Sequence, residues 1–380
     1  MIPALTVDEL QTLAQRRLPK PIYDFFDGAA YDEATKAANR QDFLSIRLRQ
    51  RVLRDIAVRD HSTTILGQRS SMPTVISPVG MSGLLSPRDA EIAAARAAKA
   101  SGIPFGLSML SLAPMEEIGQ KSGYPFWFHV MPMKDRGLLR SLLDRAVALQ
   151  SPVLIVTVDW PVPSQNHRNI RNRLGQRPNA RGVAQFLSRP GWVFAMATSG
   201  RKFEPGNFAG QGFSDPHVLS QALDASATFD YIEWLRQQWR GKILVKGIMD
   251  ADDAVAAFKA GADGISVSNH GGVQLDYAQS SIAALAEISD RVGGMGEILI
   301  DSGVRSGHDV VKALALGARA CMLGRASLYG LAVAGQAGVE HAISIIRAEL
   351  DSAMALTGCP TVKDIDRRVL VPPAHVHPAF

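Results

Sequence analysis

Residues 251–269 read ADDAVAAFKAGADGISVSN, an alanine-rich helix pattern that is joined through Gly261-Ala262 to an apolar run. Residues 308–325 read HDVVKALALGARACMLGR and repeat this order, with Gly317-Ala318 at the join. Glycine directly after a helix commonly adopts the left-handed conformation that ends it. The repeat therefore predicts two helix-to-strand joints on the same face of an α/β protein.

Eight short apolar runs along the chain predict eight strands. Their β-branched and aliphatic residues follow one another almost without a break, as in strands that are buried on both faces of a parallel sheet. Helix-length segments separate most of them, which favours an α/β fold of the (β/α)8 TIM-barrel type over an open doubly wound sheet. No GxGxxG motif follows the first run, so a Rossmann domain is not indicated. The predicted strands are residues 72–78, 103–108, 125–130, 153–159, 242–247, 264–269, 297–303 and 320–325.

The stretch between the fourth and fifth predicted strands is too long for an ordinary loop. We expect a single domain over residues 1–380, with an N-terminal helical extension and an insertion or active-site loop region over residues 160–240. Within it, residues 180–210 are rich in Gly, Pro, Arg and aromatic residues, including Trp192 and Phe194. Long loops in compact domains usually carry function. Residues 180–210 are therefore interpreted either as an active-site cover or as a membrane contact.

The composition is that of a globular enzyme. The 380 residues are 46% hydrophobic and 20% charged, with a net charge of +5. No Lys/Arg block runs through a helix pattern, so no nucleic-acid partner is expected. No apolar run approaches the ~20 residues of a membrane span, and residues 1–20 lack a signal-peptide pattern. Cys321 and Cys359 have no metal-site spacing, and no metal is expected. We expect a cytoplasmic protein, at most peripheral to the inner face of the membrane.

Polar residues stand where the predicted strands end. In a barrel the carboxyl ends of all strands meet on one face, which is where such folds keep their chemistry. The sequence therefore predicts one polar site on that face. The residues concerned are Ser77, Ser108, His129, Thr157, Asp159, Lys246, Ser268, His270, Asp301 and Arg325.

His270 is the first candidate for a catalytic group. It follows a strand and precedes Gly271-Gly272, which allow a ligand to approach the backbone closely. A general base needs an orienting partner, and Asp159 at another strand end can accept a hydrogen bond from the imidazole. We therefore interpret His270 as a base rather than a structural histidine.

Lys246 ends the apolar run ILVKG, which argues against a lysine on the surface. From the residues alone two functions remain open. The amine could form a Schiff base, or its positive charge could stabilise an anion that develops on a substrate or cofactor.

The turns after the last two strands resemble a phosphate site. DSGVRSGHD (301–309) supplies a carboxylate, glycines and Arg305 before a helix, and LGRAS (323–327) supplies Gly324 and Arg325. Such turns after strands 7 and 8 recur as phosphate sites in TIM barrels. The sequence predicts a phosphorylated cofactor or substrate.

These motifs together resemble the FMN-dependent 2-hydroxy acid oxidase and dehydrogenase family. LPKPIYDFF, SMPTVISPVGMSG, MKDRG, VTVD, ILVKGI, SNHGGVQLDY, IDSGVRSGHDVVKALALGA and LGR occur in the order found in that family and cover nearly the whole chain. The resemblance implies a (β/α)8 barrel that binds FMN at the carboxyl ends of its strands. It also implies a homotetramer that passes electrons to oxygen, a quinone or a carrier protein.

The resemblance assigns roles residue by residue. His270 corresponds to the family's active-site base, Asp159 to the acid that orients it, and Lys246 to the lysine that faces flavin N1 and O2. That last role displaces the Schiff-base interpretation. His129 aligns with a flavin-contacting glutamine. The other implied FMN contacts are Ser77, Pro78, Val79, Ser108, Thr157, Ser268, Asp301, Gly303, Arg305, Gly324 and Arg325.

The residues that hold the substrate carboxylate in the family are replaced here. The two arginine positions are occupied by Val273 and Asn166, and the two tyrosine positions by Phe25 and Met131. A buried carboxylate without cationic partners costs several kcal/mol. The pattern therefore predicts oxidation of a CH–OH group in a larger, less acidic substrate, with His270 taking a proton and FMN taking two electrons.

Two alternatives remain. A 2-hydroxy acid could be bound by a rearranged carboxylate site that uses His129, His167 or Arg168. The chain could also be a non-catalytic flavoprotein, which gives no reason for His270, Asp159 and Lys246 to persist together.

Overall fold

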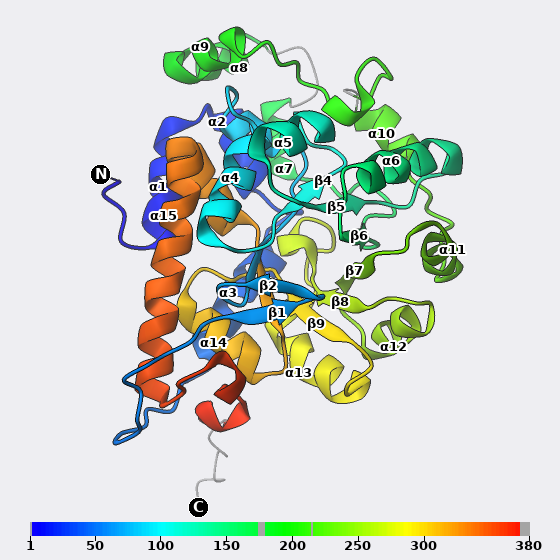
Figure 1. Cartoon of the computed structure of the whole chain (residues 1–380). Helices are drawn as coiled ribbons and strands as arrows, with labels where there is room; N and C mark the ends of the chain where they lie inside the picture. Colours follow the sequence, from blue (N-terminus) through cyan, green and yellow to red (C-terminus); the bar gives the residue numbers. More distant parts are fainter. Residues whose placement is uncertain (1, 174–178, 214–215, 373–380) are drawn as a thin grey trace, which may run out of the picture.

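The computed structural model describes residues 2–173, 179–213 and 216–372, and it contains a parallel eight-stranded TIM barrel (Figure 1). The strand order is β3-β10-β9-β8-β7-β6-β5-β4, and a parallel bridge between Ile76 and Phe105 brings the first and last strands together. All eight predicted strands are confirmed. They are β3 (Thr74–Ile76), β4 (Gly106–Ser108), β5 (Trp127–Val130), β6 (Val153–Thr157), β7 (Lys242–Ile248), β8 (Gly264–Val267), β9 (Glu297–Ile300) and β10 (Ala320–Leu323).

A short hairpin packs against one part of the barrel core. It consists of β1 (Thr63–Ile65) and β2 (Gln68–Ser70), and its turn residues Leu66 and Gly67 both have positive φ, as a two-residue hairpin turn requires. Ile65 and Leu66 share a buried cluster with strand residues such as Trp127 and Leu299. The hairpin therefore fills space between the strands that strand side chains alone leave open.

Helices surround the barrel and return the chain to each next strand. The predicted joints are confirmed, because Gly261 and Gly317 follow their helices with φ of 103° and 108°. The outer helices are α4 (Glu91–Ser101), α5 (Met115–Ser122), α6 (Arg136–Ala148), α11 (Asp230–Gln238), α12 (Ala251–Lys259), α13 (Ser281–Val292), α14 (Gly307–Ala315) and α15 (Arg325–Thr357). Short 3-10 turns are η1 (Ser82–Leu85), η4 (Val362–Asp364) and η5 (Arg367–Val369).

The N-terminal extension forms three helices, α1 (Val7–Arg17), α2 (Lys20–Asp27) and α3 (Ala34–Ser45). Thr6 caps α1, and acids in its first turn and bases in its last turn complement the helix dipole. Helix α1 packs against α15, whereas α3 contacts the 3-10 turn η3 (His270–Gly272) that follows β8. The extension thus reaches the carboxyl face of the barrel.

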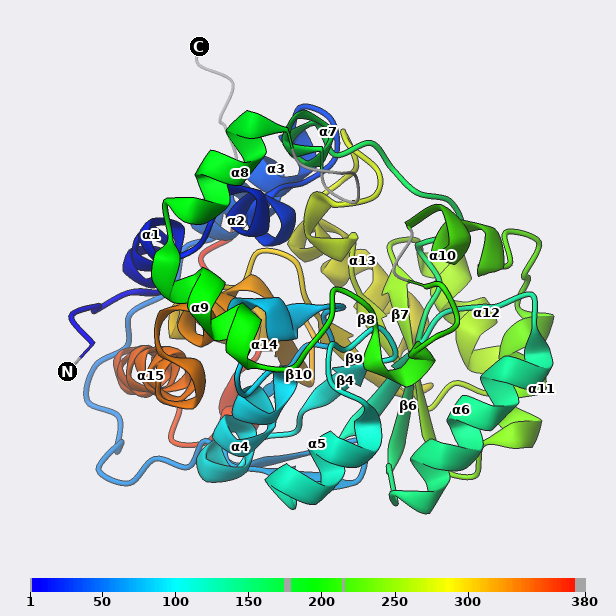
Figure 2. The same cartoon turned by 90° about the horizontal axis from the view of Figure 1, so that it is seen from above.

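The segment between β6 and β7 is largely helical. It contains α7 (His167–Asn172), α8 (Ala180–Leu187), α9 (Pro190–Thr198), η2 (Gly206–Phe208) and α10 (Pro216–Ala222) before α11. Viewed from above, α8 and α9 lie to one side of the strands (Figure 2). Trp192 donates a hydrogen bond to the Leu84 carbonyl at 2.8 Å, yet α9 has no buried residue. In the part of the chain that the structure describes, no helix is long and apolar enough to cross a membrane.

Candidate active site

A row of polar side chains runs across the ends of neighbouring strands. Ser108 on β4 lies opposite His129 on β5, and their side chains are 3.3 Å apart (Oγ to Nδ1). His129 Nε2 lies 2.9 Å from Thr157 Oγ1 on β6, and Thr157 is paired in register with Lys246 on β7. Burial, followed by the charges of Lys246 and His270, lowers the pKa of His129 to about 3. The imidazole is therefore neutral, and it joins two hydroxyls into a polar row.

Lys246 carries a buried positive charge at the centre of this site. Its ammonium donates to Ser268 Oγ at 2.9 Å and forms an ion pair with Asp301 Oδ2 at 2.9 Å. Burial alone would lower the pKa of Lys246, but the carboxylates of Asp301 and Asp159 outweigh it and raise the pKa. A Schiff base requires a neutral amine, so this environment favours the anion-stabilising role.

His270 and Asp159 form the pair that the sequence predicts. His270 Nδ1 lies 3.0 Å from Asp159 Oδ1, and burial of the carboxyl, which raises its pKa, is outweighed by His270 and Lys246, which lower it. Trp160 stands edge-on to the imidazole at 5.0 Å between ring centroids. Among the described residues, His270 Nε2 has no hydrogen-bond partner, which leaves this nitrogen for a substrate.

Other parts of the chain leave no room for a side chain at either glycine after His270. A Cβ on Gly271 would lie 2.4 Å from Arg325 Nη1, and one on Gly272 would lie 2.6 Å from the backbone nitrogen of Lys36. The expectation that these glycines admit a ligand is therefore corrected, because a guanidinium and helix α3 occupy the space.

The turns after β9 and β10 form a candidate phosphate site. Helix α15 begins at Arg325 after Gly324, and a Cβ on Gly324 would meet nothing within 4 Å. The first N–H groups of a helix suit an anion. Arg305 stacks its guanidinium on the Tyr329 ring at 5.2 Å. Gly303 approaches the Asn39 carbonyl, from which a Cβ would be only 2.4 Å away.

The side chain of Arg325 has another use. It donates to the carbonyls of Phe26, Gly28 and Gly271 at 3.1, 2.7 and 2.8 Å. The guanidinium therefore joins α2 to the turn η3, and an anion at this end of α15 would meet the backbone N–H of Arg325.

The described residues offer the charges and hydrogen-bonding groups that FMN requires. Lys246 supplies a buried cation with one donor position beyond Ser268 and Asp301, while the Ser108–His129–Thr157 row supplies neutral polar groups. Arg305 and the start of α15 supply the anion site. Ser77, Pro78 and Val79 follow β3, where Pro78 lies against Gly106 of β4.

The predicted substrate residues lie on different elements. Phe25 of α2 packs edge-on against Phe26, the Met131 N–H donates to Met109 Sδ, and the Val273 carbonyl accepts from the Ser164 hydroxyl. Asn166 caps α7 by accepting from the Asn169 N–H at 3.1 Å. Within the described residues, no hydrogen bond, ion pair or ring contact joins Phe25, Met131 and Val273 to one another.

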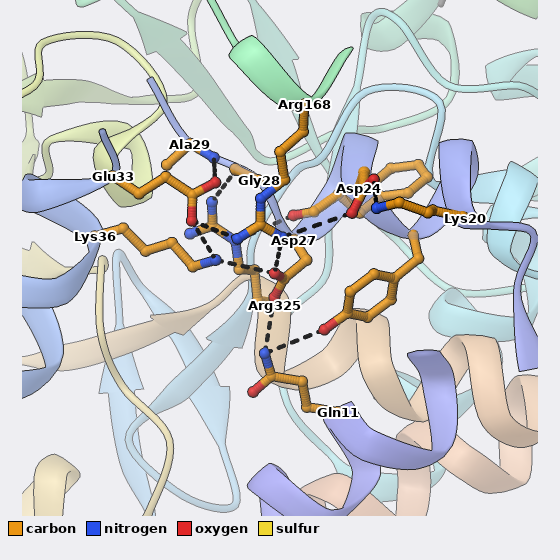
Figure 3. A network of polar contacts seen from close by, with 12 residues as sticks. Gln11, Lys20, Asp24, Asp27, Gly28, Ala29, Glu33, Lys36, Arg168 and Arg325 are labelled. Atoms are coloured by element: carbon orange, nitrogen blue, oxygen red, sulfur yellow. Dashed lines mark hydrogen bonds and ion pairs between the residues drawn. The ribbon is translucent and has the colours of Figure 1, made fainter. Parts of the chain in front are cut away.

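Arg168 is already paired with acidic residues of the chain (Figure 3). Its two terminal nitrogens lie 2.9 Å from Asp27 Oδ2 and 2.5 Å from Glu33 Oε2, and a third carboxylate, Asp24, is 3.7 Å away. Lys36 adds a second cation to Asp27 at 2.9 Å. The adjacent His167 stands edge-on to Tyr31, with ring centroids 5.7 Å apart. The guanidinium that could have replaced the missing arginines is thus neutralised internally.

Three residues near the site were not predicted from the sequence. Trp160 directly follows Asp159, and this adjacency was a usable signal. Gln274 donates to the carbonyls of Asp159 and Val162, and Asn39 pairs with Asn269 from 230 residues away. No local sequence pattern predicts either contact, because both depend on how segments far apart in the sequence pack together.

Comparisons with known proteins agree with this arrangement. A family model described as FMN-dependent dehydrogenase matches residues 14–372. An L-lactate dehydrogenase of Alcaligenes faecalis is 44% identical over 366 residues, covering 94% of this chain and 96% of that protein. One from Caulobacter vibrioides is 42% identical over 377 residues, covering 97% and 98%.

Solved structures show the same fold. The crystal structure of the monotopic membrane protein (S)-mandelate dehydrogenase superposes with a TM-score of 0.93 at 35% identity, over 98% of this chain and 100% of that one. A mandelate oxidase bound to 3,3-difluoro-2-hydroxy-3-phenylpropionic acid gives 0.82 at 33% identity, over 97% and 98%.

Proposed function

This chain belongs to the FMN-dependent dehydrogenase family, and from that premise we propose that it oxidises a CH–OH group in a substrate larger and less acidic than a simple 2-hydroxy acid. FMN is the cofactor of the family, and when bound it accepts the two electrons that the substrate loses. Lys246, the Ser108–His129–Thr157 row, Arg305 and the start of α15 would hold it.

His270 is proposed as the base. Its Nε2 takes one proton from the substrate, and Asp159 fixes the ring through Nδ1 and stabilises the imidazolium that results. Lys246 is already paired with Asp301, and its remaining donor stabilises negative charge near the reaction centre.

The ion pairs of Arg168 with Asp27 and Glu33 are the observation that best supports this choice of substrate. A 2-hydroxy acid brings a carboxylate that needs cationic partners, but Arg168 is held by Asp27 and Glu33. The positions expected to carry arginine hold Val273 and Asn166 instead. A neutral ester, amide or alcohol avoids this electrostatic cost.

Anaerobic flavin bleaching tests the proposal. The holoenzyme is mixed with (S)-mandelate, its methyl ester, its amide and 1-phenylethanol, which share an aryl group and differ in charge. Faster bleaching by the neutral compounds supports the proposal, whereas fast bleaching by (S)-mandelate alone contradicts it. His270→Asn should abolish bleaching by every compound that reacts.

A second candidate is oxidation of a 2-hydroxy acid, which the names of the relatives favour. His167 would then be the carboxylate contact, because it lies next to Asn166 at the start of α7 and, among the described residues, its ring packs on Tyr31 without forming a hydrogen bond or ion pair. If acids bleach the flavin, His167→Ala should weaken their binding at least tenfold, while Arg168→Ala should act mainly on stability.

We further propose that the protein lies at a membrane surface. Leu187 and Phe194 of α8 and α9 are 63% and 61% exposed, and α9 has no buried residue. A structurally similar (S)-mandelate dehydrogenase is named a monotopic membrane protein. Cosedimentation with vesicles that contain anionic lipid tests the proposal.

A further inference from the structure

The turn that carries His270 has an unfavourable backbone conformation. His270, Gly271 and Gly272 have φ of 57°, 65° and 77°, and only glycine adopts such angles without cost. A left-handed conformation at a non-glycine residue persists only where the surroundings hold it in place. The contacts that hold this turn therefore decide where the imidazole points.

Some of these contacts come from the barrel. The His270 N–H donates to Ser268 Oγ at 3.1 Å, and the Gly271 N–H donates to Ser302 Oγ at 2.9 Å. Two further side chains hold the turn: Arg325 donates to the Gly271 carbonyl at 2.8 Å, and Asn269 Oδ1 accepts from the Gly272 N–H at 3.2 Å and so closes the turn.

Asn269 is itself fixed by the N-terminal extension. Asn39 of α3 donates through Nδ2 to Asn269 Oδ1 at 2.8 Å, and Asn269 Nδ2 donates back to Asn39 Oδ1 at 2.8 Å. Both side chains are buried. Asn39 Oδ1 also accepts from the Ser281 N–H at 3.2 Å, and Asn269 Nδ2 donates to the Gln279 carbonyl at 3.0 Å. Every polar atom of the two amides thus has a partner, which defines one orientation for each.

We propose that Asn39 is a positioning residue for His270, acting through its reciprocal amide pair with Asn269. This inference rests on the proposed role of His270 as the base. Asn39 lies outside the barrel, and its side-chain hydrogen bonds among the described residues go to Asn269 and Ser281 rather than to His270, so its effect passes through the turn. Without it, Asn269 Oδ1 loses a donor and Nδ2 an acceptor, and the turn gains alternative conformations.

Two variants and one matched control test the inference on the FMN-loaded full chain. Asn39→Ala removes the pair. Asn39→Asp keeps the acceptor for Asn269 Nδ2 and places a carboxylate oxygen where the donor to Asn269 Oδ1 was, so it breaks one half of the pair without opening a cavity. Asn207→Ala is the control, because Asn207 is also buried but bridges the Met109 carbonyl and the Met115 N–H instead.

The first readout is stopped-flow flavin reduction at saturating probe, using whichever of (S)-mandelate, its methyl ester or its amide reduces the wild type fastest. A catalytic group displaced by about 1 Å costs on the order of 100-fold in rate. We expect the Asn39 variants to fall at least tenfold in limiting rate, with the Kd for FMN within threefold. Asn207→Ala should lower the Tm without this loss of rate.

The second readout needs no substrate. In a chain with 15N-labelled histidine, the Nδ1 proton that His270 shares with Asp159 gives a downfield resonance, identified by its loss in His270→Asn. This resonance should shift or broaden in the Asn39 variants and stay in place in Asn207→Ala. Equal limiting rates and an unmoved resonance in the Asn39 variants would overturn the inference. Full activity of His270→Asn would instead refute the proposed base.

Discussion

At the scale of single residues, the site separates into a retained half and a changed half. Lys246 pairs with Asp301 at 2.9 Å and His270 with Asp159 at 3.0 Å, as the family motifs imply. The changed half has uncharged side chains at the four positions that hold a carboxylate in the family, of which Val273 lies only three residues after His270. The difference between the halves therefore concerns the substrate rather than the chemistry.

An arginine at one of the changed positions should improve the binding of a substrate that has a carboxylate. Val273 ends the turn η3 and is partly exposed, so an arginine there has room to reach a bound carboxylate. We expect Val273→Arg to lower the KM for (S)-mandelate at least tenfold, equal to about 1.4 kcal/mol, because a charge-assisted bond replaces an unpaired charge. Val273→Leu is the control for volume. An unchanged KM in the arginine variant would place the substrate carboxyl elsewhere.

His129 should leave a signature in the pH dependence of stability. Its pKa in the folded protein is lowered to about 3 from 6.5, so between these values only the unfolded chain binds the proton. Stability is complete above pH 6.5 and decreases as the pH falls toward 3. From pH 7 to pH 5.5 the wild type should lose about 1 kcal/mol that His129→Gln does not lose.

Chemical denaturation of both FMN-saturated proteins at the two pH values measures this difference. His308→Gln, on the exposed side of α14, controls for the loss of a histidine as such. Parallel pH profiles for the wild type and His129→Gln would contradict the lowered pKa, because they would mean that His129 binds its proton equally well in the folded and unfolded states.

At the scale of elements, what could be predicted depended on whether the signal was local. The strands were recognised because β8, β9 and β10 are short apolar runs, and the helices before β8 and β10 because a glycine ends each pattern. The hairpin β1–β2 was missed, because it has only six paired residues and mixed burial. The helices α8 and α9 were not predicted either, because glycine, proline and arginine interrupt their pattern.

The same distinction applies to the site. The pair His270–Asp159 could be predicted because both residues end strands that a barrel brings together. The internal pairing of Arg168 could not, since it depends on how α7, at the start of the insertion, meets α2 about 140 residues earlier in the chain.

An ion pair is one of the contacts that join the insertion to the helices around the barrel. Arg201 bonds Glu117 of α5 at 2.7 and 3.1 Å, and this contact, partly offset by burial, lowers the pKa of Glu117 to about 2. The contribution is complete above pH 4.5 and is lost as the pH falls toward 2. At neutral pH, Glu117→Gln should weaken the attachment of this segment to α5 by about 1 kcal/mol. Trypsin should then cleave after Arg201 or Lys202 about fivefold faster.

Lys121→Gln provides the comparison, because Lys121 bonds the same carboxylate at 2.8 Å from the exposed side of α5. Its cleavage rate should stay within twofold of the wild type. Equal acceleration in both variants would contradict the prediction, because Lys121→Gln leaves the contact between Glu117 and Arg201 in place.

At the scale of the whole molecule, exposed apolar side chains occur at several places, and three of them lie on α8 and α9. The barrel core is closed by helices on its outside, whereas α8 and α9 expose Val183, Leu187 and Phe194 beside the carboxyl face (Figure 1). Arg88 stacks on the exposed Phe194 ring at 5.6 Å, so a cation lies next to the apolar side chains. Together with a net charge of +5, this favours an anionic lipid surface over bulk water.

The double variant Leu187→Glu/Phe194→Glu should therefore remain in the supernatant with vesicles that contain phosphatidylglycerol, under conditions where the wild type sediments. Two buried apolar side chains of this size contribute about 3–6 kcal/mol, and two added anions oppose the lipid charge. Leu356→Glu is the matched control, because Leu356 is 57% exposed at the far end of α15. Flavin reduction should be equal in all three proteins. If the double variant sediments as the wild type does, a different face of the barrel meets the membrane.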